Sequence, residues 1–71
     1  MNTMQLECFL AVADNLSFAR AAEQLHVTQP AITHQINSLE NELQAKLVRR
    51  TTRIVELTPD GRTFWVMPKI F

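Results

Sequence analysis

The chain has 71 residues, of which 46% are hydrophobic and 20% charged, and it contains one glycine. This composition is typical of a single small globular domain, near the size limit for independent folding, and it excludes a disordered or fibrous chain. One cysteine excludes an intramolecular disulfide, and the lack of a signal-sequence pattern or a run of about 18 apolar residues favours a cytoplasmic protein without membrane contact.

The formal charges balance to zero over the whole chain but are distributed unevenly. Residues 1–45 carry five carboxylates and a single cation, Arg20, whereas residues 46–71 carry six cations and two carboxylates. Four of those cations fall within residues 46–53, and such a cluster can follow the phosphates of a nucleic acid even in a neutral protein. A solvated loop is the alternative explanation for the same cluster.

Two helices are predicted in the first part of the chain. Apolar residues repeat with helical spacing over residues 4–14, and Asn15 is expected to end this helix in the left-handed conformation. Ser17 is a suitable N-cap for a second helix, whose apolar face contains two adjacent alanines and therefore allows another helix to cross closely. Residues 26–27 leave room only for a tight turn, with His26 as a structural turn residue.

A third helix is predicted over residues 28–43. Thr28 is a suitable N-cap, and Pro30 lies in the first turn, where its missing N–H removes no helical hydrogen bond. The apolar stripe, expected to be buried, consists of Ile32, Ile36, Leu39 and Leu43. The opposite face carries Pro30, Thr33, His34, Asn37 and Asn41, with Gln29 and Gln35 on its flanks.

The polar face of this helix contains no carboxylate before Glu40. A surface that approaches a polyanion cannot carry carboxylates, and Thr, Gln, Asn and His side chains can form hydrogen bonds with base edges. The positive end of the helix dipole adds a site for a backbone phosphate. The pattern therefore predicts a helix-turn-helix with its recognition helix at residues 28–43. An ordinary amphipathic helix with a neutral face is the alternative.

Two short strands are predicted after the third helix, at residues 46–49 and 53–57, with residues 50–52 as the bend of a hairpin. Such a hairpin would be a wing that presents Arg50 and Arg53 beside the recognition helix, where a minor groove or its phosphates would lie.

A fourth helix is predicted to begin with Thr58 as N-cap and Pro59 at its first position, and Gly61 and Pro68 are both expected to limit it. The last eight residues carry a large apolar surface for a tail left in water, which favours pairing with another chain. The expected dimerisation residues are Phe64, Trp65, Met67 and Phe71.

The chain resembles the N-terminal DNA-binding domain of LysR-type transcriptional regulators over about its first sixty-six residues. The resemblance rests on FLAVADNLSFARAAEQLHVTQPAITHQINSLENEL followed by LVRRTTRIVELTPDG. It implies a mainly α, winged helix-turn-helix fold at residues 1–58, with residues 59–71 as the start of a linker helix that pairs in a dimer. Full-length bacterial members continue into a larger domain that binds a small-molecule inducer, which these 71 residues do not include.

The resemblance also implies roles for single residues. Helix 28–43 would lie in the major groove and wing 46–57 at the minor groove of double-stranded DNA. Gln29, Pro30, Thr33 and His34 would face the groove, Thr28 would sit at a phosphate, and Arg53 would reach the minor groove while Arg50 holds the wing or a phosphate. With Gln35 from the helix flank, the expected DNA-contacting residues are Thr28, Gln29, Pro30, Thr33, His34, Gln35, Arg50 and Arg53.

Two departures from the family pattern bear on this site. His34 stands where arginine is common, and Gln44 replaces the usual glycine after the third helix. The titratable His34 would thus exchange a permanent charge for one that depends on pH.

Three classes of function remain open from the sequence. The first is sequence-specific DNA binding, and the second is an interaction module that pairs with itself or with a full-length relative and modulates its DNA binding. The third is an enzyme, which is not expected, because the two histidines, Cys8 and the carboxylates form no recognisable ligand or nucleophile pattern. Cys8 lies in an apolar run and is expected in the core, and neither a metal nor a cofactor is expected.

Overall fold

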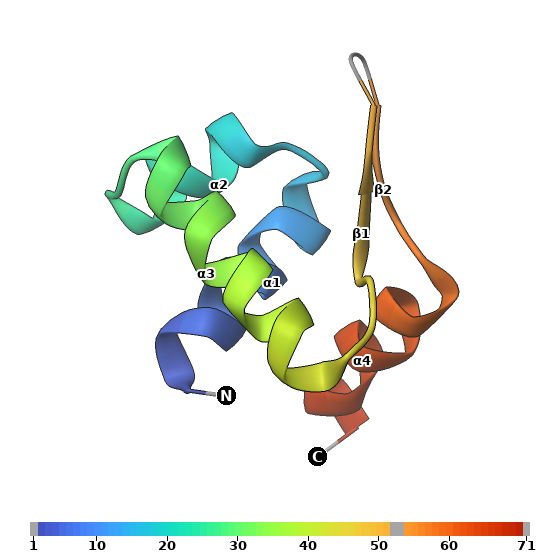
Figure 1. Cartoon of the computed structure of the whole chain (residues 1–71). Helices are drawn as coiled ribbons and strands as arrows, with labels where there is room; N and C mark the ends of the chain where they lie inside the picture. The colour runs from blue at the N-terminus through green and yellow to red at the C-terminus, as the bar shows by residue number, and fades with distance from the viewer. Residues whose placement is uncertain (1, 52–53, 71) are drawn as a thin grey trace.

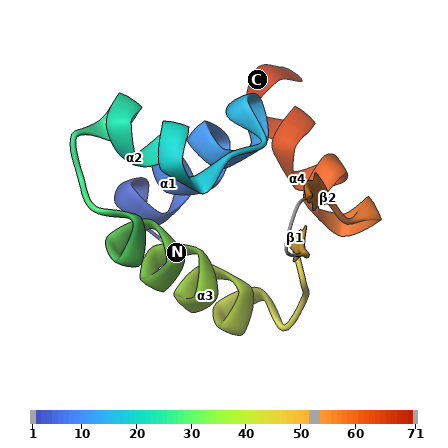
Figure 2. The same ribbon diagram turned by 90° about the horizontal axis from the view of Figure 1, so that it is seen from above.

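The computed structural model describes residues 2–51 and 54–70, and within them the chain forms four helices and one hairpin (Figure 1). In chain order these are α1 (Thr3–Asn15), α2 (Phe18–Leu25), α3 (Gln29–Leu43), β1 (Val48–Arg50), β2 (Val55–Leu57) and α4 (Pro59–Ile70). The three-helix body, the hairpin and the fourth helix confirm the predicted mainly α, winged helix-turn-helix fold. Figure 2 shows α3 along one side of the body, with the hairpin standing beside its C-terminal end.

The helices begin where side-chain caps were expected. Ser17 accepts a hydrogen bond from the Arg20 backbone N–H at 3.2 Å, and Thr28 accepts one from the Ala31 N–H at 3.3 Å. These bonds satisfy N–H groups that the first helical turn cannot pair internally. The predicted caps are therefore confirmed, and the position of the α2–α3 turn follows from them.

The first three helices end with non-glycine residues in the left-handed conformation. Leu16, His26 and Gln44 have φ values of 50°, 59° and 55°. The prediction that Asn15 would be the left-handed residue is wrong. Asn15 stays in α1 because its side-chain amide donates hydrogen bonds to the Ala11 carbonyl and to Gln24, both at 2.8 Å.

The core lies between α1, α2 and α3 and extends beneath the first strand. Its largest fully buried side chains are Phe9, Ile32, Leu39, Leu47, Val12 and Cys8. Ala21 and Ala22 are buried and present little side-chain bulk at the contacts of α2 with α1 and α3. The prediction that Leu43 would be buried is wrong, since it is 36% exposed in the last turn of α3. Glu40, by contrast, is only 8% exposed.

The wing is a two-stranded antiparallel hairpin with two different faces. Val48 pairs with Leu57, Arg49 with Glu56 and Arg50 with Val55, so Arg49 and Glu56 share one face and the other pairs share the opposite face. The strands are shorter than predicted, and Arg50 belongs to β1 and not to the bend. The Thr51 N–H donates to the Ile54 carbonyl at 2.8 Å, and residues 52–53 lie outside the described part of the chain.

Helix α4 follows the wing directly and leans on α1. The prediction that Gly61 and Pro68 would limit it is wrong, because the helix runs through both positions to Ile70. Gly61 instead allows close packing, since a Cβ atom there would lie 1.9 Å from the Leu47 carbonyl oxygen. The Phe64 ring meets the Phe9 ring edge to face, with centroids 5.6 Å apart.

Candidate nucleic-acid interface

The solvent-facing side of α3 is formed by short polar side chains near its N-terminus. Gln29, Pro30 and His34 are exposed and Thr33 is half-buried, whereas Ile32 on the opposite side is fully buried. The first turns of α3 contain no acidic residue that would oppose the positive end of the helix dipole. This end of α3 can therefore approach an anion without electrostatic repulsion from its own side chains.

A shallow hollow brings these side chains together with one residue of the wing. It is lined by Gln29, Pro30, Thr33, His34, Asn37 and Arg50. The wing rises from the end of α3 toward the level of its N-terminal half, which accounts for the approach of Arg50 (Figure 1). Of the predicted contacts, Gln29, Pro30, Thr33, His34 and Arg50 are thus gathered on one surface.

Arg50 is positioned by an aromatic ring in α2. Its guanidinium carbon lies 4.4 Å from the centre of the Phe18 ring, and Phe18 is only 7% exposed. This cation–π contact restrains the side chain while leaving the N–H groups at the guanidinium edge able to donate. The sequence indicates no role for Phe18 in this surface, because the contact joins residues that are 32 positions apart.

Arg49 lies on the other face of the wing and has a different partner. Its Nη1 atom is 3.4 Å from Glu56 Oε1 on the paired strand, and both side chains are at least half exposed. Such an exposed pair contributes little to stability. The carboxylate nevertheless offsets the charge of Arg49, so Arg50 is the β1 cation that lines the hollow with Gln29 and His34.

Two predicted contacts among the described residues do not line this hollow, namely Thr28, which is the exposed N-cap of α3, and Gln35. Gln35 is half-buried and does not line the hollow, because its position on α3 is turned away from Thr33 by about 160°, as 100° per residue requires. Arg53 lies outside the described residues. Asn37, by contrast, lines the hollow although it was not among the predicted contacts. Its helical spacing from Pro30, Thr33 and His34 was the signal that could have found it.

The described residues contain no candidate metal site and no candidate membrane-spanning helix. Among the described residues, no group of three or more His, Cys, Asp or Glu side chains could hold a metal ion. Within residues 2–51 and 54–70, no helix combines the length and apolar character needed to cross a bilayer. Cys8 is 1% exposed, and burial, with a contribution from Glu7, raises the pKa of its thiol.

A model of a known protein family matches the segment of the chain that forms these helices and the wing. Residues 3–62 match the model described as "Bacterial regulatory helix-turn-helix protein, lysR family". The chain belongs to the LysR family. The matched residues form its helix-turn-helix DNA-binding domain, so the family resemblance found in the sequence is confirmed.

Curated relatives and solved structures agree with this assignment. The transcriptional regulator TfdT of Cupriavidus pinatubonensis is 47% identical over 64 residues, which are 90% of this chain and 28% of TfdT. The glycine cleavage system transcriptional activator of Escherichia coli K12 is 51% identical over 61 residues, which are 86% of this chain and 20% of the activator. The chain thus spans about a quarter of the length of these regulators.

The fold is shared with a LysR-family protein solved on DNA. The crystal structure of the CbnR DNA-binding domain in complex with DNA superimposes with a TM-score of 0.93 at 41% identity, covering 99% of this chain and 80% of that one. The proteins found by these comparisons are transcription regulators.

Proposed function

We propose that the chain binds double-stranded DNA sequence-specifically as the DNA-binding part of a bacterial transcription regulator. Helix α3 would lie in the major groove and the wing at the minor groove. Residues 1–58 would form the DNA-binding unit, and residues 59–71 would begin the linker to the rest of the regulator. The observation that supports this most is the surface where neutral side chains of α3 meet Arg50 of the wing.

The first turns of α3 have the chemistry needed to distinguish bases. Gln29 can donate and accept hydrogen bonds at once, Thr33 adds a hydroxyl and His34 an imidazole, all on one accessible surface. The major groove presents a distinct donor and acceptor pattern for each base pair, and a good contact discriminates by about 1–3 kcal/mol. Thr28 and the free N–H groups beside it would hold a backbone phosphate.

The wing would supply affinity that does not depend on sequence. Arg50 is held on Phe18 with its donor edge available, which suits a phosphate oxygen beside the groove that α3 occupies. Arg53 would extend this contact into the minor groove. Support comes from CbnR, whose DNA-binding domain has the same fold and was solved on DNA.

Pairing between two chains through α4 is the second part of the proposal. Phe64 and Trp65 already contact α1, through the Phe9 ring and through an indole hydrogen bond to Asp14 of 2.9 Å, so only part of their surface remains for a partner. Another hollow lies on the face of α4 that is turned away from these contacts, as 100° per residue requires, and it is lined by Leu57, Pro59, Arg62, Thr63 and Val66. The Met67 side chain and Phe71, also proposed as dimer contacts, lie outside what the structure describes.

A binding selection from randomised duplex DNA tests this function. A dimer is expected to select a two-fold repeat with half-sites one or two helical turns apart. As a protein that binds bacterial DNA, it would act in the cytoplasm. Failure to enrich any sequence would overturn sequence-specific binding. Enrichment of single half-sites would overturn pairing.

Sedimentation across a concentration series distinguishes the DNA-binding proposal from an interaction module. Concentration-dependent pairing without DNA enrichment would favour a module that modulates a full-length relative. A small-molecule inducer would be bound by a domain that lies outside these 71 residues.

A further inference from the structure

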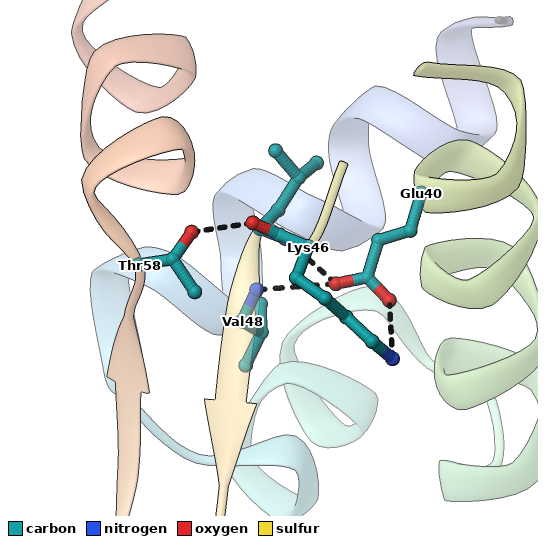
Figure 3. Close-up of polar contacts among 5 residues, drawn as sticks. Glu40, Lys46, Val48 and Thr58 are labelled. Carbon is teal, nitrogen blue, oxygen red and sulfur yellow. Dashed lines mark hydrogen bonds and ion pairs between the residues drawn. The ribbon is translucent and has the colours of Figure 1, made fainter. Parts of the chain in front are cut away.

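A buried carboxylate joins the recognition helix to the base of the wing. Glu40 lies on α3 and is only 8% exposed. Its Oε2 atom accepts hydrogen bonds from the backbone N–H groups of Leu47, at 2.8 Å, and Val48, at 3.2 Å. Its Oε1 atom lies 3.8 Å from Lys46 Nζ, and the Lys46 side chain is 80% exposed (Figure 3). One side chain of α3 thus contacts three consecutive residues where the first strand begins.

These bonds satisfy the backbone N–H groups of two buried residues. Leu47 and Val48 are 1% and 8% exposed, and an unpaired buried N–H costs free energy comparable to a lost hydrogen bond. Hydrogen bonds to an ionised carboxylate are roughly twice as strong as those to a neutral acceptor. The two N–H groups also compensate for the burial of the charge on Glu40.

The same short segment is held from its other side by the start of α4. The Thr58 hydroxyl donates to the Lys46 carbonyl (Figure 3), and the Thr58 N–H donates to the Leu47 carbonyl at 3.1 Å. Residues 46–48 are therefore fixed between α3 and α4. Arg50 follows Val48 by two residues on the same face of the strand, so the position of this base determines where Arg50 lies relative to α3.

A carboxylate near a DNA-binding surface would ordinarily weaken binding. Glu40 lines the hollow between α3 and β1 together with Thr33, Asn37 and Arg50, close to the surface proposed to meet DNA. Its charge is offset by two backbone N–H groups and a lysine. If this side chain only had to fill a buried position, a neutral side chain would cost less free energy there.

We propose that Glu40 is a positioning residue for DNA binding, which holds the base of the wing so that Arg50 and the polar face of α3 engage one duplex together. This inference rests on the proposed function. Glu40 itself would contact no DNA. Its loss would leave α3 able to enter the groove but would uncouple the wing from it.

The salt dependence of binding to a mixed-sequence duplex tests this role. Glu40→Leu keeps the helix propensity and fills the buried site, but it offers no acceptor. We expect the slope of log K against log salt to decrease in magnitude by about 0.9, one phosphate contact, in this variant. Glu40→Gln retains one acceptor oxygen and should lose less. Glu42→Gln, which removes the same charge from an exposed position whose side chain contacts Gln5 of α1, should keep the full slope.

A purely structural role would not change that slope. A destabilised protein would bind with a lower active fraction and an unchanged dependence on salt, so a folded Glu40→Leu with the wild-type slope would overturn the proposal. If the wild-type chain binds no duplex, the proposed function itself fails, and that result is distinct from an unchanged slope.

Hydrogen exchange in the free protein provides a second measurement if Glu40→Leu does not fold. In Glu40→Gln the amide protons of Leu47 and Val48 should exchange about tenfold faster than in the wild type, because the charge assistance to both bonds is lost. The amide of Phe9 in α1 should be unaffected. Equal exchange of the Leu47 and Val48 amides in the two proteins would overturn the role of Glu40 without any reference to DNA.

Discussion

Replacing Gly61 with alanine should destabilise the protein, although alanine is the better helix former. In the first turn of α4 the new Cβ atom would lie 1.9 Å from the Leu47 carbonyl oxygen and 2.8 Å from its carbonyl carbon. Ordinary contact begins near 3.4 Å, so the helix and the strand base must separate by about 1.5 Å at the oxygen. The obstacle is backbone, which cannot rotate away as a side chain could.

The magnitude follows from what the separation disrupts. The Leu47 carbonyl accepts from the Thr58 N–H, and the Leu47 N–H donates to Glu40, so movement strains both bonds. A strained bond costs about 1 kcal/mol and overpacking typically about 1–3 kcal/mol. Against this, alanine in a helix gains about 1 kcal/mol over glycine. The net loss in the free energy of unfolding is about 2–4 kcal/mol, or a fall in Tm of roughly 8–30 °C for a domain of this size.

Thermal unfolding followed by circular dichroism measures this difference. Thr63→Ala is the matched control, because it lies in the same helix, is exposed and gives up only a side-chain bond to the Pro59 carbonyl of 3.1 Å. Its Tm should remain within a few degrees of the wild type, since surface changes are usually within about 0.5 kcal/mol. If Gly61→Ala unfolds at the wild-type temperature or higher, the close approach of Leu47 is not what requires glycine.

Four further outcomes are expected. Arg50→Ala should reduce the salt slope of DNA binding by about 0.9, whereas Arg62→Ala on α4 should not, and equal slopes in both variants would remove Arg50 from the interface. Gln29→Ala should lose about 1–3 kcal/mol of discrimination between a selected site and random duplex, and equal weakening on both would rule out base readout. Gln44→Gly should raise Tm by a few degrees, because glycine relieves about 0.5–1 kcal/mol of strain at a φ of 55°; a lower Tm would contradict this. Burial raises the pKa of Cys8, so its thiol should resist alkylation until the protein unfolds, and rapid alkylation of the folded protein would contradict this. The contribution of the neutral thiol to stability is present at neutral pH and should be lost as the pH rises through that pKa.

Local chemistry accounts for the elements that the sequence predicted well. The caps at Ser17, Thr28 and Thr58 involve residues only three positions apart, and the apolar stripe of α3 repeats at helical spacing. These are properties of a short segment and need no knowledge of the rest of the fold. The neutral polar face of α3 is also a property of a short segment. The sequence alone therefore determined where the helices begin and which side of α3 faces solvent.

The tertiary structure decided what depends on residues far apart in the chain. Leu16 and not Asn15 takes the left-handed position, since the Asn15 amide finds a partner in α2. Gly61 lies within α4 and does not end it. A glycine is required there because the Leu47 carbonyl at the base of the strand leaves no room for a Cβ atom. Glu40 is buried because its carboxylate meets backbone N–H groups seven and eight residues away. Each outcome rests on a contact between separate elements, and such contacts leave no periodic pattern in the sequence.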